Sequence, residues 1–170
     1  MGLFSFIKEA GEKLFKSKDA EAAAAAVTKA PDDTEAKARV EAANRAAGDS
    51  IEAYIKAQNL VITALTVTFD SSTGTASVFG VAADQATREK ALLCAGNVQG
   101  VVAVKDMMSV DQSAPEATFY TVVSGDNLSK ISKQHYGDPN KYMKIFEANK
   151  PMLTHPDKIY PGQVLRIPPQ

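Results

Sequence analysis

The sequence predicts an α+β protein made of two small modules, with the element order α-β-β-α-β in the first and β-α-α-β in the second. Alternating apolar and polar residues mark the short strands, and runs of apolar residues at helical spacing lie between them. A stretch poor in apolar residues, DQSAPEAT, gives a linker at residues 112–118. The chain of 170 residues is long enough for two small domains.

The composition is typical of a soluble globular protein. Hydrophobic residues make up 45% of the chain, charged residues 23%, and the net charge is −1. We expect no nucleic-acid partner, because such proteins carry a strongly basic surface. No apolar run reaches the roughly 18 residues of a membrane span, and charges at positions 8–13 interrupt the apolar start that a secretory signal needs. We therefore expect a cytoplasmic monomer without stable membrane insertion.

The first 32 residues predict two helical segments. In residues 1–18 the apolar residues recur at roughly helical spacing, which predicts a short amphipathic helix interrupted near Gly11. Its polar face mixes charges of both signs, which favours docking on the protein over lying on a membrane. Residues 19–32 contain the run EAAAAAV and form an Ala-rich insertion of strong helix formers that Pro31 ends.

Residues 33–111 contain the elements of the first module. A helix with Pro and Asp at its start comes first, with Gly48 as a candidate break. The segment LTVTFDSSTGTASVFG alternates on both sides of a polar turn and predicts a β-hairpin. A helix from Asp84 to Gly96 or Asn97 and a further strand complete the order α-β-β-α-β.

Residues 119–169 contain the second module. The strand FYTVVSG precedes a helix with Asp126 near its N-cap and Gly137 at its end. A second helix begins at Pro139, and a Pro-Gly turn leads into the last short strand.

The segments YTV, SGDNL, YG and IYPGQVLRIP, at their spacing between Tyr120 and Pro168, resemble the LysM family. In LysM domains a groove between the loop after the first strand and the loop after the second helix binds chains of N-acetylglucosamine. The resemblance implies that this groove would involve Gly125, Asp126, Asn127, Leu128, Pro151, Met152 and Leu153.

The first module, with its segments TGTASVFG and GNVQGVVAVKD, resembles a BON domain, a fold associated with membranes or phospholipid in exported proteins. Both modules behind the start MGLFSFIKEAGEKLF resemble the BON–LysM potassium-binding proteins of the bacterial cytoplasm. Between Phe15 and Ile62 the chain departs from that pattern, being longer and richer in alanine. The resemblance implies a potassium sensor or buffer that compacts when the ion binds.

The residues also suit a monovalent cation site made of backbone oxygens. A weakly hydrated cation needs no formal negative charge, because carbonyl dipoles can replace its water shell. Carbonyls without intrahelical partners occur at helix C-termini, and the stretches IKEAGEK and AGNVQGV each place a glycine at such a point. From the residues alone, both stretches are more typical of ordinary glycine caps of helices. The resemblance implies a K⁺ site, open also to Rb⁺ or Cs⁺, formed by the carbonyls of Ile7, Ala10, Glu12, Gly96, Val98 and Val101.

Other site chemistries find less support in the sequence. It contains no EF-hand loop and no Cys–His cluster for zinc. We expect no enzyme, because no catalytic constellation or phosphate loop is present, and Cys94 reads as a small buried helix residue. The main alternative is an exported LysM protein that binds peptidoglycan or N-acetylglucosamine. A membrane-associated BON protein is the third reading.

Overall fold

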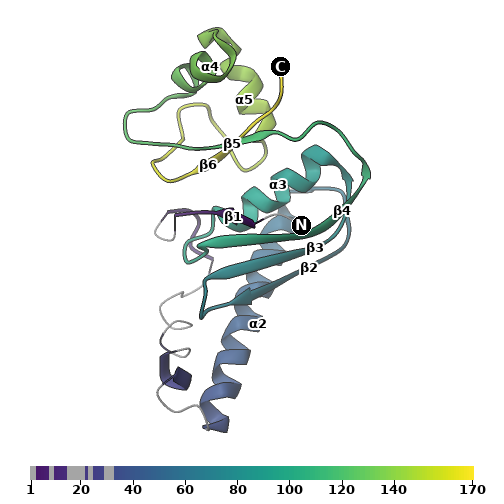
Figure 1. The fold of residues 1–170 in the computed structure, drawn as a ribbon, viewed down its shortest axis with the longest axis vertical. Coiled ribbons are helices and arrows are strands. Elements are labelled where there is room, and N and C mark those ends of the chain that lie inside the picture. The colour runs from purple at the N-terminus through teal and green to yellow at the C-terminus, as the bar shows by residue number, and fades with distance from the viewer. Residues whose placement is uncertain (1–2, 8–9, 15–21, 23–24, 29–32) are drawn as a thin grey trace.

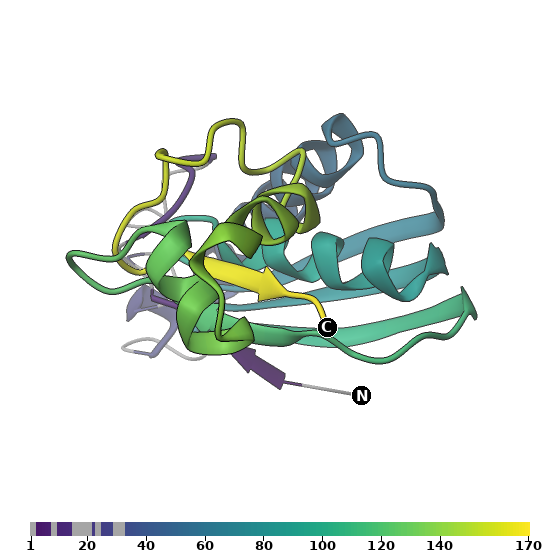
Figure 2. The same ribbon diagram turned by 90° about the horizontal axis from the view of Figure 1, so that it is seen from above.

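A computed structural model describes residues 3–7, 10–14, 22, 25–28 and 33–170 (Figure 1). The chain has two separate hydrophobic cores, one in an N-terminal domain and one in a C-terminal domain. The C-terminal domain lies on top of helix α3 (Gln85–Gly96) in Figure 1, and the view from above in Figure 2 shows it over part of that helix. The α+β fold class is therefore confirmed.

The N-terminal domain is a four-stranded sheet in the order β1-β4-β3-β2, with two helices packed on it. Strands β2 (Ile62–Asp70) and β3 (Thr75–Asp84) form an antiparallel hairpin, and β4 (Ala103–Gln112) runs parallel to β3. Helix α3 is the crossover between β3 and β4, and α2 (Thr34–Ala57) packs beside it. The predicted order α-β-β-α-β is present.

The core of this domain follows from simple periodicity. Strand β2 buries Leu65, Val67 and Phe69, while the residues between them are exposed. Helix α2 buries Ile51 and Ile55, which are spaced by one helical turn and have 0% exposed surface. One face of the sheet is thus sealed by apolar side chains of the helices.

Helix α2 continues through Gly48, which does not break it. Gly48 is buried where the helix crosses β2, and a Cβ at this position would lie 2.6 Å from the carbonyl oxygen of Val67. This glycine therefore allows a close approach of helix and strand.

The C-terminal domain has the predicted order β-α-α-β. Strand β5 (Thr118–Thr121) pairs antiparallel with β6 (Val164–Ile167). Between them lie α4 (Leu128–Tyr136), the short 3₁₀ helix η1 (Pro139–Lys141) and α5 (Tyr142–Ala148).

The caps of α4 agree with the prediction and identify the N-cap residue itself. Gly137 ends the helix in the left-handed conformation, with φ of 74°. The N-cap is Asn127, whose side chain accepts a hydrogen bond from Lys130 N at 2.9 Å. Asp126 instead accepts hydrogen bonds from the Tyr120 hydroxyl and from Val123 N, which closes the loop before the helix.

The predicted N-terminal helix is wrong for the described residues of its range. Leu3–Ser5 form strand β1, which pairs antiparallel with β4, and residues 6–7 and 10–14 are not helical. Phe4 and Phe6 pack against the N-terminal core, whereas Leu3 and Ile7 are exposed. This alternation has a period of two, and in so short a run it also matches helical spacing, which misled the prediction. Of the Ala-rich insertion at 19–32, residues 22 and 25–28 are described and helical, and the rest lies outside the described residues.

In the part of the chain that is described, none of the helices has the length and low polarity needed to cross a membrane.

Replacing Gly48 by alanine should lower stability, although alanine is the better helix former. We expect a loss of about 1 to 3 kcal/mol in the free energy of unfolding, because a methyl group must displace β2. Urea unfolding measures this change in the free energy of unfolding. Ala42→Gly, at an exposed position of the same helix, should cost about 1 kcal/mol through helix propensity alone. A stabilised Gly48→Ala protein would contradict the close approach.

Candidate functional site

The structure brings the two glycine-containing stretches together. Glu12 forms an isolated parallel bridge with Val98. The Glu12 N–H donates to the carbonyl of Asn97 at 2.8 Å, and the Gln99 N–H donates to the carbonyl of Glu12 at 2.8 Å. The two halves of the predicted site are therefore neighbours, although they are far apart in the sequence.

Two glycines allow this contact. A Cβ on Gly11, which has φ of +110°, would lie 2.1 Å from the carbonyl oxygen of Asn97. A Cβ on Gly96 would lie 2.0 Å from the ring of Phe6. Gly96, the last residue of α3, has no positive φ, so it is needed for space rather than for an unusual backbone conformation.

Several carbonyls of the predicted ligand set accept one backbone hydrogen bond each. Ile7 O accepts from Ala10 N at 3.0 Å, and Val98 O accepts from Val101 N at 3.1 Å. A carbonyl oxygen has two lone pairs, so each retains one for a further partner. Gly96 ends α3, where the helix dipole is negative. The arrangement offers neutral oxygen donors that favour a cation.

Carboxylates do not contribute a metal cluster here. Among the residues described, no group of three or more His, Cys, Asp or Glu side chains is placed to hold a metal ion. The Glu12 residue is exposed. A divalent site of the calcium or zinc type is thus unsupported in this region.

The C-terminal domain also borders the candidate site. A Cβ on Gly162 would lie 2.8 Å from the Cβ of Ala10, so the two chain segments touch. Burial, with the Glu12 carboxylate nearby, raises the pKa of Tyr160 to about 12. Burial also raises the pKa of Tyr54 on α2, with smaller contributions from Cys94, Glu12 and Tyr160. Both hydroxyls are therefore neutral at pH 7.

Asn97 connects the site to the C-terminal domain. Its side-chain amide donates to Val164 O at 2.9 Å and accepts from Val164 N at 2.8 Å. The residue is 4% exposed. Sequence reasoning identified Asn97 only as a helix end, because nothing in the sequence indicates a partner so distant along the chain.

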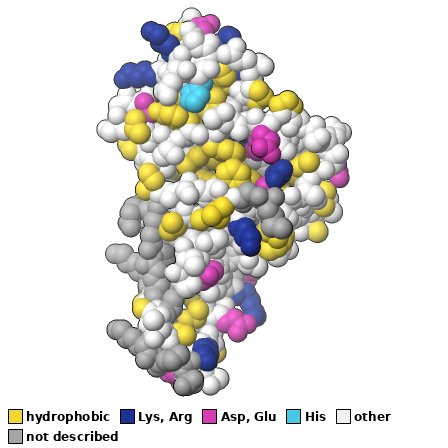
Figure 3. Space-filling view, in the orientation of Figure 1, with side chains coloured by type: hydrophobic (Ala, Val, Ile, Leu, Met, Phe, Trp, Pro, Cys, Tyr) yellow, Lys and Arg dark blue, Asp and Glu magenta, His cyan; other side chains and the backbone are white. Residues whose placement is uncertain are grey.

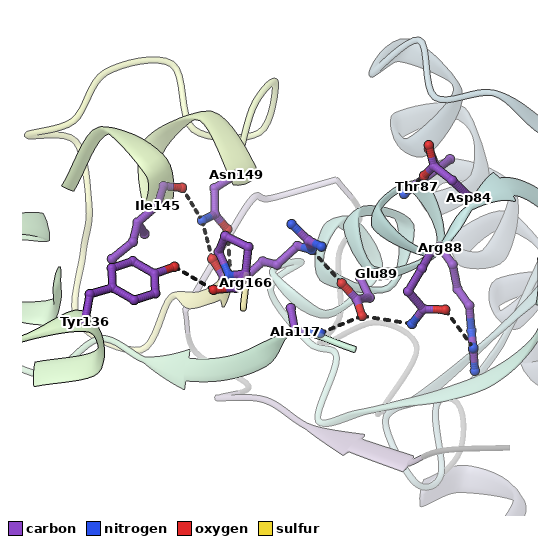
Figure 4. A network of polar contacts seen from close by, with 11 residues as sticks. Asp84, Thr87, Arg88, Glu89, Ala117, Tyr136, Ile145, Asn149 and Arg166 are labelled. Carbon is purple, nitrogen blue, oxygen red and sulfur yellow. Dashed lines mark hydrogen bonds and ion pairs between the residues drawn. The ribbon is translucent and has the colours of Figure 1, made fainter. Parts of the chain in front are cut away.

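A second polar contact joins the domains through Glu89 of α3 (Figure 4). Its carboxylate accepts from Arg166 Nε at 2.5 Å, from Ala117 N in the linker at 2.9 Å and from Gln85 Nε2 at 2.8 Å. Glu89 is 2% exposed and Arg166 8% exposed. The buried charges are thus compensated by each other and by further hydrogen bonds, as burial requires.

Apolar contacts surround these polar ones. Figure 3 shows hydrophobic side chains gathered in a band across the middle of the molecule, below the C-terminal domain. The rings of Phe4 in β1 and Phe119 in β5 meet edge to face, with centroids 5.0 Å apart. Met152 packs against the N-terminal core and its sulfur accepts from Asn97 Nδ2 at 3.4 Å.

Comparison with known proteins identifies a relative that is similar over nearly the whole chain. The potassium binding protein Kbp of Escherichia coli O6:H1 is 45% identical over 169 residues, which cover 99% of each chain. The chain belongs to the Kbp family. The LysM domain family matches residues 120–168.

Two further relatives share shorter regions. An uncharacterized protein of Deinococcus radiodurans is 53% identical over 51 residues, which are 30% of this chain and 19% of its own. The uncharacterized protein YqbP of Bacillus subtilis is 38% identical over 66 residues, which are 34% of this chain and 29% of its own.

The residues predicted for the LysM groove have structural roles in this chain. Leu128 and Leu153 are buried in the C-terminal core, and Met152 lies against the N-terminal domain. Asp126 and Asn127 stabilise the loop and the N-terminus of α4. Pro151 lines a narrow cleft beside α3, and Gly125 is exposed.

Replacing Gly11 by alanine should release the N-terminal segment without unfolding either domain. The methyl group would collide with Asn97 O, and the positive φ adds about 1 to 3 kcal/mol of strain. We expect hydrogen exchange at the amides of Glu12 and Gln99 to accelerate, while the amides of β3 stay protected. Gly137→Ala is the matched control, because Gly137 also has a positive φ but no atom would lie within 4 Å of its Cβ. Unchanged exchange in Gly11→Ala would refute the close contact.

Proposed function

We propose that this protein is a cytoplasmic potassium-binding protein, a sensor or buffer, that binds K⁺ selectively through backbone carbonyls and compacts on binding. The observation that supports it most is the bridge between Glu12 and Val98, in a chain that is 45% identical to a protein named for potassium binding. The proposed ligands are the carbonyls of Ile7, Ala10, Glu12, Gly96, Val98 and Val101.

The donor set fits a monovalent cation. All proposed ligands are neutral oxygens, which suit a weakly hydrated ion better than a strongly hydrated divalent one. Val98 and Val101 have 0% exposed surface, so on that side the ion would be shielded from water and carbonyl dipoles would act more strongly.

The ion would act by strengthening the contact between two segments that backbone hydrogen bonds already join. Where the proposed ligand carbonyls of these segments converge, their like dipoles would oppose one another. A bound K⁺ would offset this repulsion and fix Ala10 and Glu12 more firmly against the N-terminal domain. Gly162 of the C-terminal domain rests on this ordered segment, so ion binding shifts the population towards the docked form.

Selectivity would follow from packing around the site. Sodium is smaller and would require the carbonyls to move closer together. Gly11 and Gly96 already lie in contact with Asn97 O and the Phe6 ring, and closely packed segments resist such contraction. Rubidium and caesium are larger than sodium and do not require the carbonyls to move closer together, so we expect them to replace potassium.

The LysM match supports binding of peptidoglycan or N-acetylglucosamine as a second candidate. In the docked form Met152 and Leu153 are engaged in the protein's own cores, which favours the first proposal. Sedimentation with purified peptidoglycan, in K⁺ and in Na⁺ buffer, tests the alternative, since retention in either buffer supports it.

Potassium, rubidium and caesium should compact the protein, while sodium and lithium should not. Small-angle scattering at constant ionic strength, with choline as the replacement cation, measures the radius of gyration.

Cys94 provides an independent measure in the same titration. Burial raises its pKa to about 12, and it lines a narrow cleft with Pro151 and Met152 of the C-terminal domain. Undocking would expose the thiol and lower its pKa, so more thiolate would form at pH 8. We therefore expect a thiol reagent to react slowly in K⁺ and faster in Na⁺. Equal responses to Na⁺ and K⁺ in both measurements would indicate only an ionic-strength effect.

Potassium binding should depend on the peptide backbone and not on the Glu12 side chain. Glu12→Gln should leave K⁺ affinity within about fivefold of the unchanged protein, since an exposed charge near a site contributes on the order of 0 to 1 kcal/mol. Deleting residues 2–12 should abolish selective binding in isothermal titration calorimetry. A deletion variant that binds K⁺ at the original affinity would place the ion elsewhere.

A further inference from the structure

Asn97 uses both its backbone and its side chain to connect separate parts of the molecule. Asn97 is the C-cap of α3, and its N–H donates to Leu93 O at 2.9 Å. Its carbonyl accepts a hydrogen bond from Glu12 N at 2.8 Å. Its side-chain amide binds both peptide groups of Val164. One buried residue therefore contacts the helix end, the N-terminal segment and the C-terminal domain.

Strand β6 is completed on its outer edge by asparagine side chains. One edge of β6 pairs with β5. On the other edge, Asn149 donates to Arg166 O at 2.8 Å and accepts from Arg166 N at 2.7 Å. Asn97 makes the same pair of bonds to Val164. A side-chain amide offers the donor and acceptor of a peptide group, so Asn97 acts as a strand residue supplied by the other domain.

We propose that Asn97 is the positioning residue that couples the ion site to docking of the C-terminal domain. The inference rests on the proposed function. Gly96 and Val98, on either side of Asn97, supply proposed ligands, and the carbonyl of Asn97 holds Glu12. When an ion fixes these peptide groups, it also fixes the direction of the Asn97 side chain, which then meets Val164.

The contact between Glu89 and Arg166 also joins the two domains, but it involves none of the peptide groups of the proposed ion site. Glu89 lies in the middle of α3, in a buried helix packed on the sheet. None of its hydrogen-bond partners among the described residues is one of the proposed ion ligands. It should therefore stabilise docking with or without the ion, whereas Asn97 should make docking respond to the ion.

The test compares Asn97→Ala with Glu89→Gln in the full-length protein, titrated with KCl at constant ionic strength. Calorimetry gives the K⁺ affinity, and small-angle scattering gives the radius of gyration. Asn97→Ala should still bind K⁺, with affinity lowered about 5- to 10-fold, the lower part of the range of measured couplings. Its radius of gyration should no longer respond to K⁺. Glu89→Gln should be more expanded without the ion and should still compact at saturating K⁺.

Asn97→Asp gives a second reading if the alanine variant does not fold, as judged by circular dichroism. The aspartate keeps the acceptor for Val164 N but faces Val164 O with a second oxygen, so docking should be lost. Its negative charge beside the site should leave K⁺ affinity no weaker than in Asn97→Ala. Compaction of either folded variant to the original radius would overturn the coupling role, as would complete loss of K⁺ binding in both. Failure of the unchanged protein to respond to K⁺ would instead refute the proposed function itself.

Discussion

The hydrogen bonds between Glu12 and residues 97–99 are the contact on which the arrangement of this molecule depends. They hold an N-terminal segment of the chain against the end of α3. Both sides must come close enough for peptide groups to bond directly, which explains a glycine at position 11 facing Asn97 O and a glycine at position 96 facing Phe6. Gly162 of the C-terminal domain lies against the same N-terminal segment, at Ala10.

On the proposed function, docking of the C-terminal domain on the N-terminal domain should be close to all or none. Asn97 and Val164 satisfy each other's buried polar groups, and Glu89 and Arg166 neutralise each other's charge. Partial separation would leave buried donors or charges unpaired, which costs about 1 to 3 kcal/mol for a neutral group and more for a charge. On that proposal the buried groups would be paired when the domains are docked and hydrated when they are apart, and intermediate arrangements would be unfavourable. A bound ion could bias such a two-state element.

The sequence predicted the fold well and identified the two stretches that meet at the candidate site, but not their connection to the C-terminal domain. Alternation in β2 and the left-handed cap at Gly137 are local features, and both appear as expected. The first residues form a strand and not a helix, because a run as short as Leu3–Ser5 does not distinguish the two periods and pairing with β4 decides between them. The side-chain role of Asn97 was beyond prediction, since its partner Val164 lies 67 residues away and is bound through the backbone.

A LysM domain in such a protein need not bind glycan, because a fold does not determine its function. Here the outer edge of β6 and Met152 contact the N-terminal domain. On the proposed function this use has a thermodynamic consequence. If K⁺ favours docking, docking must favour K⁺ binding by the same factor. The neutral carbonyl site alone then sets only part of the affinity, and the C-terminal domain supplies the rest by holding the N-terminal segment in place.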